Sequence, residues 1–217
     1  AAMESGVASR PIEDFPAYRQ RLSEFVFRSG LAMKPVFERA RKAPKRVIYA
    51  EGEDERVLRA AQILIDEGIA RPLLIGRPEI IAKRIGQLGL RLAPGRDIEV
   101  INPASDPRYL DYVATYHRLM ERKGVSPDLA RTLVRTNFTT IAALAVHKGD
   151  ADAMICGTVG RFPIHLQVID DIIGRHPEAR NLYALSLLIV PGGTLFLCDT
   201  YVNENPSAAD ICETTVL

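Results

Sequence analysis

Hydrophobic residues follow a regular alternation along most of the chain. A β-branched and aromatic run at 47–49 predicts a buried strand, and an acidic cluster at 51–55 comes directly after it. The next apolar positions recur at helical spacing and end before Gly68; they are Val57, Leu58, Ala61, Leu64 and Ile65. A second strand is predicted at 72–76. This strand–helix–strand unit predicts a parallel sheet, and ligands bind at the carboxyl edge of such sheets.

The alternation continues to the end of the chain, as a three-layer α/β sandwich around a parallel sheet requires. Further strands are predicted over 98–101, 153–156 (as a buried strand), 185–190 and 194–198. Further helices are predicted over 78–88, 108–120, 164–173 and from 208 onward. Residues 127–147 form one long helix or two, and both alternatives stay open. The tyrosines of the segment 108–120 predict a core face.

The first 43 residues differ from the rest. They look helical, and their apolar positions form one stripe interrupted at Gly30: Leu22, Phe25, Val26 and Leu31. Pro35 is predicted to begin a further helix. The stripe needs a surface to cover, either on this domain or on a domain outside the chain, and the sequence favours neither.

Length and composition exclude several classes of protein. The 217 residues suffice for one large or two small domains, and 47% hydrophobic residues permit a sizeable core. Lys and Arg number 28 against 27 Asp and Glu, so we expect neither a nucleic-acid partner nor a membrane surface. No apolar run would span a bilayer, and the start does not resemble a signal peptide. Cys156 and Cys198 lie in apolar runs and predict buried thiols, and the three cysteines suggest no disulfide framework, so we expect a cytoplasmic protein. No Cys/His spacing resembles a zinc site.

The acidic loop after the first strand is the first candidate binding site. Asp54 stands where a helix cap belongs, and capping by an acidic side chain is common. Glu51 and Arg56 would pair across the loop or bind a polar ligand. Both a structural role and direct ligand contact stay open.

A glycine-containing loop is the second candidate. Gly157, Thr158, Gly160 and Arg161 follow a predicted strand and precede a helix. Exposed backbone amides in such a loop can cradle a phosphate or a carbonyl oxygen, and an arginine adds a planar cation. A plain turn explains the glycines equally well. No nucleotide-binding glycine fingerprint or P-loop occurs.

Other polar residues give weaker signals. Arg131 and Arg135, one helical turn apart, would meet coenzyme A phosphates or form a solvated helix face. The histidines show no recognisable catalytic order and predict surface or packing residues: His117, His147, His165 and His176. We therefore assign no catalytic residue.

An ordered series of motifs resembles the phosphate acetyltransferase and butyryltransferase family. The segments are EGEDERVLRAA from Glu51, LLIGRP from Leu73, Lys123-Gly124-Val125, HKGDADAM from His147 and Asn203-Glu204-Asn205-Pro206. Members move an acyl group between coenzyme A and phosphate. The resemblance implies a two-lobed phosphotransacetylase-like fold and a cleft for acetyl-CoA. It also implies a first lobe at 44–150, an incomplete second lobe at 151–217 and a homo-oligomer formed through this domain.

A second resemblance precedes the first. AAMESGVASRPI at 1–12 and YRQRL at 18–22 are similar to the end of a bacterial malic enzyme catalytic domain. This order resembles the multidomain NADP-dependent malic enzymes, so we read the chain as a fragment in which residues 1–43 are a helical tail. The resemblance implies NADP and a divalent metal, Mg or Mn, in a preceding catalytic domain that oxidatively decarboxylates malate to pyruvate. The fragment itself is expected to bind no cofactor.

Two departures from the family pattern argue against acyl transfer. The loop after Gly157 is short and lacks a cluster of Ser and Thr, and Met120 stands about where the family places an arginine. The sequence thus favours a regulatory acetyl-CoA-binding domain of a malic enzyme without transferase activity of its own. An active phosphate acetyltransferase and a structural oligomerisation domain are the alternatives.

Overall fold

The computed structural model describes residues 14–190 and 193–216, while the side chains of 20–32 lie outside the described part. The two segments that resemble the end of a malic enzyme catalytic domain, 1–12 and 18–22, and the apolar stripe therefore fall wholly or largely outside it. The chain forms two compact units. One comprises Arg39–Arg180, and the other combines Ala1–Glu38 with Asn181–Leu217. The expected boundaries at residues 43 and 150 stay predictions.

The larger unit contains a four-stranded parallel sheet in the order β3-β2-β1-β4. Its strands are β1 (Lys45–Tyr49), β2 (Ala70–Ile75), β3 (Glu99–Ile101) and β4 (Ala153–Ile155). Ile48 of β1 is in register with Leu73 of β2 and with Met154 of β4. The predicted parallel sheet is thus confirmed, and all its carboxyl ends lie at one edge.

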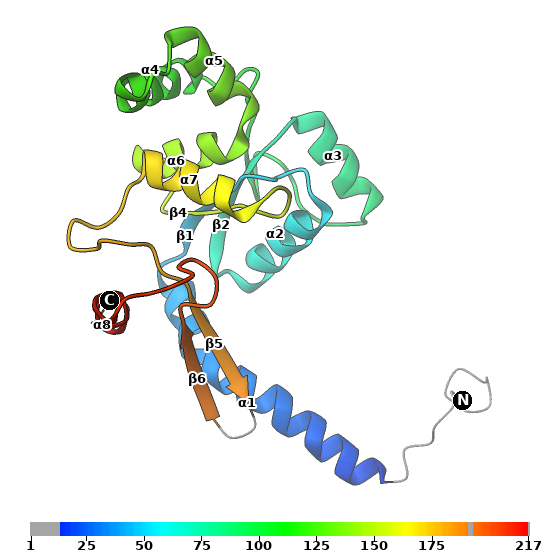
Figure 1. Cartoon of the computed structure of the whole chain (residues 1–217). Coiled ribbons are helices and arrows are strands. Elements are labelled where there is room, and N and C mark those ends of the chain that lie inside the picture. The colour runs from blue at the N-terminus through cyan, green and yellow to red at the C-terminus, as the bar shows by residue number, and fades with distance from the viewer. Residues whose placement is uncertain (1–13, 191–192, 217) are drawn as a thin grey trace. The chain divides into compact units, whose positions relative to one another are not determined.

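Helices cover both faces of this sheet (Figure 1). On one side lie α2 (Glu55–Glu67) and α3 (Pro78–Gln87); on the other lie α4 (Tyr109–Met120), α5 (Pro127–Thr136), α6 (Phe138–His147) and α7 (Phe162–Ile172). A 3-10 turn, Glu121–Lys123, follows α4. Consecutive β1 side chains enter different cores, because side chains alternate across a strand: Tyr49 packs with α2 and α3, and Ile48 with α4 and α6. The predicted three-layer α/β arrangement is confirmed.

Local sequence signals explain the helix boundaries. The Asp54 side chain accepts a hydrogen bond from the backbone N–H of Arg56 at the start of α2, and Gly68 ends this helix in the left-handed region at φ 64°. The open question about residues 127–147 is settled in favour of two helices. Asn137 lies between them in an extended conformation, and its side chain caps α6 at the N–H of Thr140.

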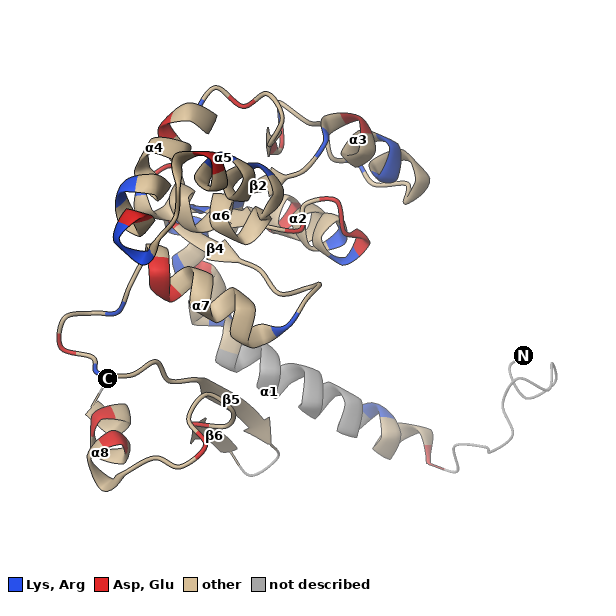
Figure 2. Ribbon diagram, turned by 45° about the horizontal axis from the view of Figure 1, so that its top comes forward, with Lys and Arg blue, Asp and Glu red and all other residues tan. Residues whose placement is uncertain are grey.

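The predicted tyrosine face of α4 is confirmed. Tyr112 and Tyr116 are buried, and the Tyr112 hydroxyl donates to Asp150 Oδ2 at 2.7 Å. Burial, followed by this contact, raises the pKa of Tyr112 far above its ordinary value, so the hydroxyl stays protonated. The charged residues of α2, α3 and α4 include both signs (Figure 2), as near-neutral composition predicts.

The smaller unit contains a hairpin and a helix. β5 (Leu185–Val190) pairs antiparallel with β6 (Gly193–Cys198), and α8 (Ala208–Val216) follows. The strand pair and the last helix are as predicted. The Asp199 carboxylate accepts hydrogen bonds from the backbone N–H groups of Ala184, Val202 and Asn203, which ties the end of β6 to the start of β5. Among the described helices, none is long and apolar enough to cross a bilayer.

Three details of the sequence analysis are wrong. Neither predicted thiol is fully buried: Cys198 is exposed, because the described part of the chain places no core against β6, and Cys156, just after β4, is half-buried. β4 is not fully buried, since it is the last strand of its sheet and Ile155 is 47% exposed. Pro35 lies inside α1 (Phe15–Lys42) instead of starting a helix. Proline removes one hydrogen bond but has a φ compatible with a helix, so its neighbours can continue the helix.

An ion pair at the amino ends of β1 and β4 predicts how the stability of the fold depends on pH. Arg46 donates from its backbone N–H and its guanidinium to Asp152, at 2.8 and 3.0 Å. These hydrogen bonds lower the pKa of Asp152 from 3.8 to about 2. Because the folded pKa is lowered, the stabilisation is present above pH 3.8 and is lost as the pH falls toward 2.

We therefore expect Asp152→Asn to be less stable than the unchanged chain near neutral pH, with the difference shrinking toward pH 2. Urea unfolding at a series of pH values measures it. Asp128→Asn, which changes a carboxylate that is 91% exposed, controls for replacing a surface acid. A difference that stayed constant over this pH range would contradict the assignment.

Candidate functional site

A cavity of about 590 Å³ lies in the larger unit, where the loop after β1 meets the start of α6 and the loop before α7. This is the sheet edge at which the sequence predicts ligand binding. Its lining combines carboxylates, one guanidinium, one imidazole, hydroxyls and apolar groups: Glu51, Glu53, Asp54, Arg84, Leu133, Thr136, Asn137, Phe138, Thr139, Val159 and His165.

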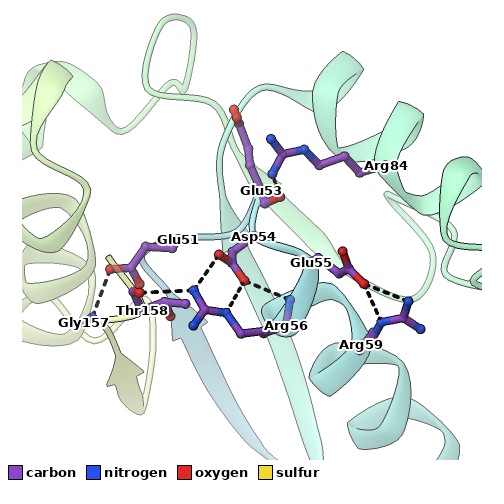
Figure 3. Close-up of polar contacts among 9 residues, drawn as sticks. All are labelled: Glu51, Glu53, Asp54, Glu55, Arg56, Arg59, Arg84, Gly157 and Thr158. Atoms are coloured by element: carbon purple, nitrogen blue, oxygen red, sulfur yellow. Dashed lines mark hydrogen bonds and ion pairs between the residues drawn. The ribbon is translucent and has the colours of Figure 1, made fainter. Parts of the chain in front are cut away.

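The acidic loop and the glycine loop are in direct contact (Figure 3). Arg56 pairs with Asp54, its Nε lying 3.0 Å from Oδ1, and its Nη2 donates to the Thr158 carbonyl oxygen at 3.2 Å. The hydrogen bond from Arg56 holds the pKa of Asp54 below its ordinary value, which keeps this carboxylate ionised. The predicted cap is present, because Asp54 also accepts the backbone N–H of Arg56. Direct contact of Asp54 or Arg56 with a ligand stays a prediction.

Glu51 joins the ends of two neighbouring strands. It follows β1, and its Oε1 accepts a hydrogen bond from the backbone N–H of Gly157, just beyond β4, at 2.9 Å. Its other oxygen, Oε2, is buried and has no hydrogen-bond partner among the described residues. Buried carboxylate oxygens are normally paired, so this one marks a place to look for a ligand.

His165 holds the glycine loop onto α6. Its Nε2 lies 2.9 Å from the Val159 carbonyl oxygen, and its Nδ1 lies 2.8 Å from Thr139 Oγ1. A carbonyl can only accept, so Nε2 donates, and in the neutral ring Nδ1 accepts from the threonine hydroxyl. The histidine thus has a packing role, as the sequence indicated, but it also lines the cavity.

Gly160 gives a prediction about this loop. It has φ +107°, and a Cβ there would lie 2.6 Å from His165 Nε2. We expect Gly160→Ala to lower the free energy of unfolding by about 1–3 kcal/mol, because the backbone is strained and the imidazole is displaced. Gly149→Ala is the matched control, since Gly149 also has a positive φ but has open space around its Cβ. Denaturant unfolding of both variants measures the contribution of the contact, and equal losses would contradict it.

Several predicted residues do not line the cavity. Arg131 pairs with Asp128 at 2.6 Å, and the Arg135 guanidinium lies 4.7 Å from the centre of the Tyr109 ring. The first contact lies within α5, and the second joins α5 to α4. Arg161 begins α7 as its N-cap residue, without a side-chain cap, and is not among the lining residues. Gly157 and Thr158 are placed by their contacts with Glu51 and Arg56, respectively, and Gly160 lies beside His165.

Sequence reasoning missed Glu53, Arg84 and the start of α6. The Glu53 carboxylate accepts hydrogen bonds from the guanidinium and from the backbone N–H of Arg77, at 2.8 and 2.9 Å. Arg84 donates to the Glu53 carbonyl oxygen. The hydrogen bond from Arg77 lowers the pKa of Glu53, so it too is ionised. The one available signal was the position of Glu53 within the conspicuous acidic loop. The start of α6 was hidden because the helix break at Asn137 was undecided.

Carboxylates outnumber cations in the cavity. Its lining contains Glu51, Glu53 and Asp54 against the single guanidinium of Arg84. Arg77 and Arg56 neutralise Glu53 and Asp54, so the unfavourable charge that a phosphate group would meet in the cavity is mainly that of Glu51. Within the described residues, no group of three or more His, Cys, Asp or Glu side chains could hold a metal ion.

The fold and this cavity define an α/β domain of the phosphotransacetylase type. A phosphotransacetylase from Streptococcus pyogenes has a similar fold, with a TM-score of 0.74 over 85% of this chain and 56% of that one, at 21% identity. The EutD phosphotransacetylase from Staphylococcus aureus gives 0.73 over 83% of this chain and 55% of that one, at 20% identity. The chain belongs to the family described as Phosphate acetyl/butaryl transferase, which matches residues 31–217.

Malic enzymes are similar to the whole chain. An NAD-dependent malic enzyme from Rhizobium meliloti is 58% identical over all of this chain and 28% of its own length. An NADP-dependent malic enzyme from Escherichia coli is 47% identical over all of this chain and 29% of its length. A phosphate acetyltransferase from Nitratidesulfovibrio vulgaris is 30% identical over 83% of the chain and 25% of its length. The chain thus spans less than a third of these relatives.

Proposed function

We propose that this chain is the regulatory, acetyl-CoA-binding domain of a malic enzyme and has no transferase activity of its own. The malic enzymes align with all of the chain, including residues 1–30, which precede the family match. The parent protein would oxidatively decarboxylate malate to pyruvate in the cytoplasm, with a nicotinamide dinucleotide and Mg or Mn in its catalytic domain. NADP stays the prediction, although the relative at 58% identity is NAD-dependent.

The cavity carries this proposal. It lies at the carboxyl edge of the parallel sheet and is large enough for part of a cofactor-sized ligand. Transfer of an acyl group to phosphate needs a place for phosphate beside the thioester, with cationic or N–H groups that stabilise the developing oxyanion. Arg84 is the one guanidinium in the lining, and the Glu51 carboxylate, which no arginine in the described residues pairs with, disfavours phosphate there. Binding without transfer is what this lining supports.

The residue at position 120 adds nothing to that argument. Met120 is buried in the core of the larger unit with α4 and α6, and it does not line the cavity. Its side chain is packed in the core and does not contact the cavity. The case against transfer rests on the short glycine loop and the charge of the cavity.

Two assays on the full-length parent protein test the proposal. We expect no thioester formation from coenzyme A and acetyl phosphate, and we expect acetyl-CoA to change the rate of malate oxidation. Regulation requires that acetyl-CoA bind two conformations of the protein with different affinities. Malate oxidation that is unchanged at every acetyl-CoA concentration would refute regulation, and steady thioester turnover would favour the active transferase.

An oligomerisation domain is the second candidate function. Large apolar side chains on α7 are exposed in this chain, Phe162 at 45% and Ile164 at 52%. Exposed apolar groups on one helix support an interface, including the homo-oligomer that the family resemblance implies. This alternative predicts assembly without acyl-CoA binding, so specific binding measured by calorimetry would exclude a purely structural role.

A further inference from the structure

The three carboxylates of the cavity differ in whether their oxygens accept hydrogen bonds from the protein. Glu53 accepts hydrogen bonds from Arg77, and Asp54 accepts hydrogen bonds from Arg56. Glu51 Oε2 is buried and accepts none from the described residues. A buried oxygen without a donor is costly, so the site is more stable when a donor reaches it.

The position of Glu51 Oε2 is determined by the hydrogen bond that the other carboxylate oxygen, Oε1, accepts. Oε1 accepts the Gly157 N–H at 2.9 Å, which orients the group between the ends of β1 and β4. The loop 157–160 adjoins this carboxylate and is held by contacts from Glu51, Arg56 and His165. A ligand atom would therefore reach Oε2 through a shift of this loop.

We propose that Glu51 is a specificity-determining residue that accepts a hydrogen bond from an N–H or O–H group in the uncharged part of an acyl thioester. This inference rests on the proposed function and names the part of acetyl-CoA that enters the cavity. The amide and hydroxyl groups of the pantetheine arm supply such donors. The phosphates of the same ligand stay outside, since the Glu51 carboxylate repels them and the lining holds a single guanidinium.

Glu51→Gln reverses the hydrogen-bonding character of this position while keeping its size. Only the amide oxygen can accept the Gly157 N–H, so the side-chain NH₂ takes the place of Oε2. A donor then stands where an acceptor stood, and one negative charge is lost from the cavity. We expect the affinity for acetyl-CoA and for S-acetylpantetheine to fall about tenfold to a hundredfold, as for the loss of a charged hydrogen bond. The affinity for inorganic phosphate should rise.

Glu55→Gln is the matched control. It makes the same chemical change in the same acidic cluster, but Glu55 begins α2, pairs with Arg59 on the exposed side of that helix and does not line the cavity (Figure 3). The affinity of the Glu55→Gln variant for acetyl-CoA, S-acetylpantetheine and inorganic phosphate should equal that of the unchanged protein. Thermal unfolding of each variant checks that folding is preserved.

The experiment is calorimetric titration of the full-length protein and both variants with acetyl-CoA, S-acetylpantetheine and inorganic phosphate. Hydrogen exchange of the amides at 157–160, with and without S-acetylpantetheine, shows whether the loop responds to the ligand, which a merely structural role for Glu51 would not produce. Weaker thioester binding by Glu51→Gln alone, with altered exchange, supports the inference.

The remaining outcomes separate the inference from the proposed function. Equal binding by Glu51→Gln and the unchanged protein, or equal losses in both variants, would overturn the inference. Absence of binding of either thioester to the unchanged protein would overturn the inference and acetyl-CoA regulation together. A specific effect of Glu51→Gln, with malate oxidation indifferent to acetyl-CoA, would leave the inference standing and remove only the regulatory function.

Discussion

Gly52→Ala is expected to lower the free energy of unfolding by about 3 kcal/mol, through overpacking against a central strand. A Cβ at this position would lie 2.6 Å from the Ile75 carbonyl oxygen, 2.7 Å from Leu74 Cβ and 2.8 Å from the Ile75 nitrogen. These atoms belong to β2, which is paired on both sides and cannot retreat easily. The Gly52 N–H also donates to the Ile75 carbonyl at 3.0 Å, so a displaced loop would lose this hydrogen bond.

The same substitution should weaken ligand binding, because Gly52 lies between two carboxylates of the cavity, Glu51 and Glu53. Denaturant unfolding and acetyl-CoA titration measure the two effects. Gly86→Ala is the control: Gly86 lies within α3, and a Cβ there meets nothing within 4 Å. This control should be neutral or stabilising by up to about 1 kcal/mol, since alanine favours the helix. Similar destabilisation by both variants would show that the close approach to β2 is not the cause.

Leu144→Ala is expected to lower the free energy of unfolding by about 2–5 kcal/mol. Leu144 lies in α6, has no exposed surface, and belongs to the core between the sheet and the helices α4, α5 and α6. Truncation removes apolar contacts and leaves a cavity that the surrounding backbone can fill only in part. Because α6 also begins at the ligand cavity, a loosened core would reduce ligand binding as well.

Leu110→Ala provides the comparison for this core substitution. Leu110 lies in α4 with 72% of its surface exposed, so the same chemical change should alter the free energy of unfolding by no more than about 0.5 kcal/mol. Urea unfolding of both variants gives the two values. A loss at position 144 as small as that at position 110 would mean that the described core is not formed in solution.

The sequence allowed accurate prediction of the elements whose cause is local. The end of α2 at Gly68 and its cap at Asp54 follow from backbone preferences and short-range hydrogen bonds, so they were predictable. The parallel sheet followed from the order of strands and helices, because crossover connections allow few alternatives. The division between α5 and α6 was left open, since apolar spacing continues across Asn137 and only the extended backbone there separates the two helices.

The composition of the site depends on tertiary contacts. Arg131 and Arg135 share a helix face, which made them candidates, but α5 turns this face toward α4, where Arg135 lies against Tyr109. No local pattern indicates which neighbour a polar helix face will meet. Glu53 and His165 joined the lining for the same reason, since their neighbours come from distant parts of the chain.

The sequence by itself determined the α/β class, most element limits, the family resemblance and the two loops that would meet a ligand. Those features depend on residue periodicity and on local backbone chemistry. Only the tertiary structure decided that Glu51, 106 residues away from Gly157, accepts its N–H and leaves the other carboxylate oxygen buried. The physical reason is that parallel strands bring distant chain segments to one edge, and side-chain partners there are chosen by packing in three dimensions.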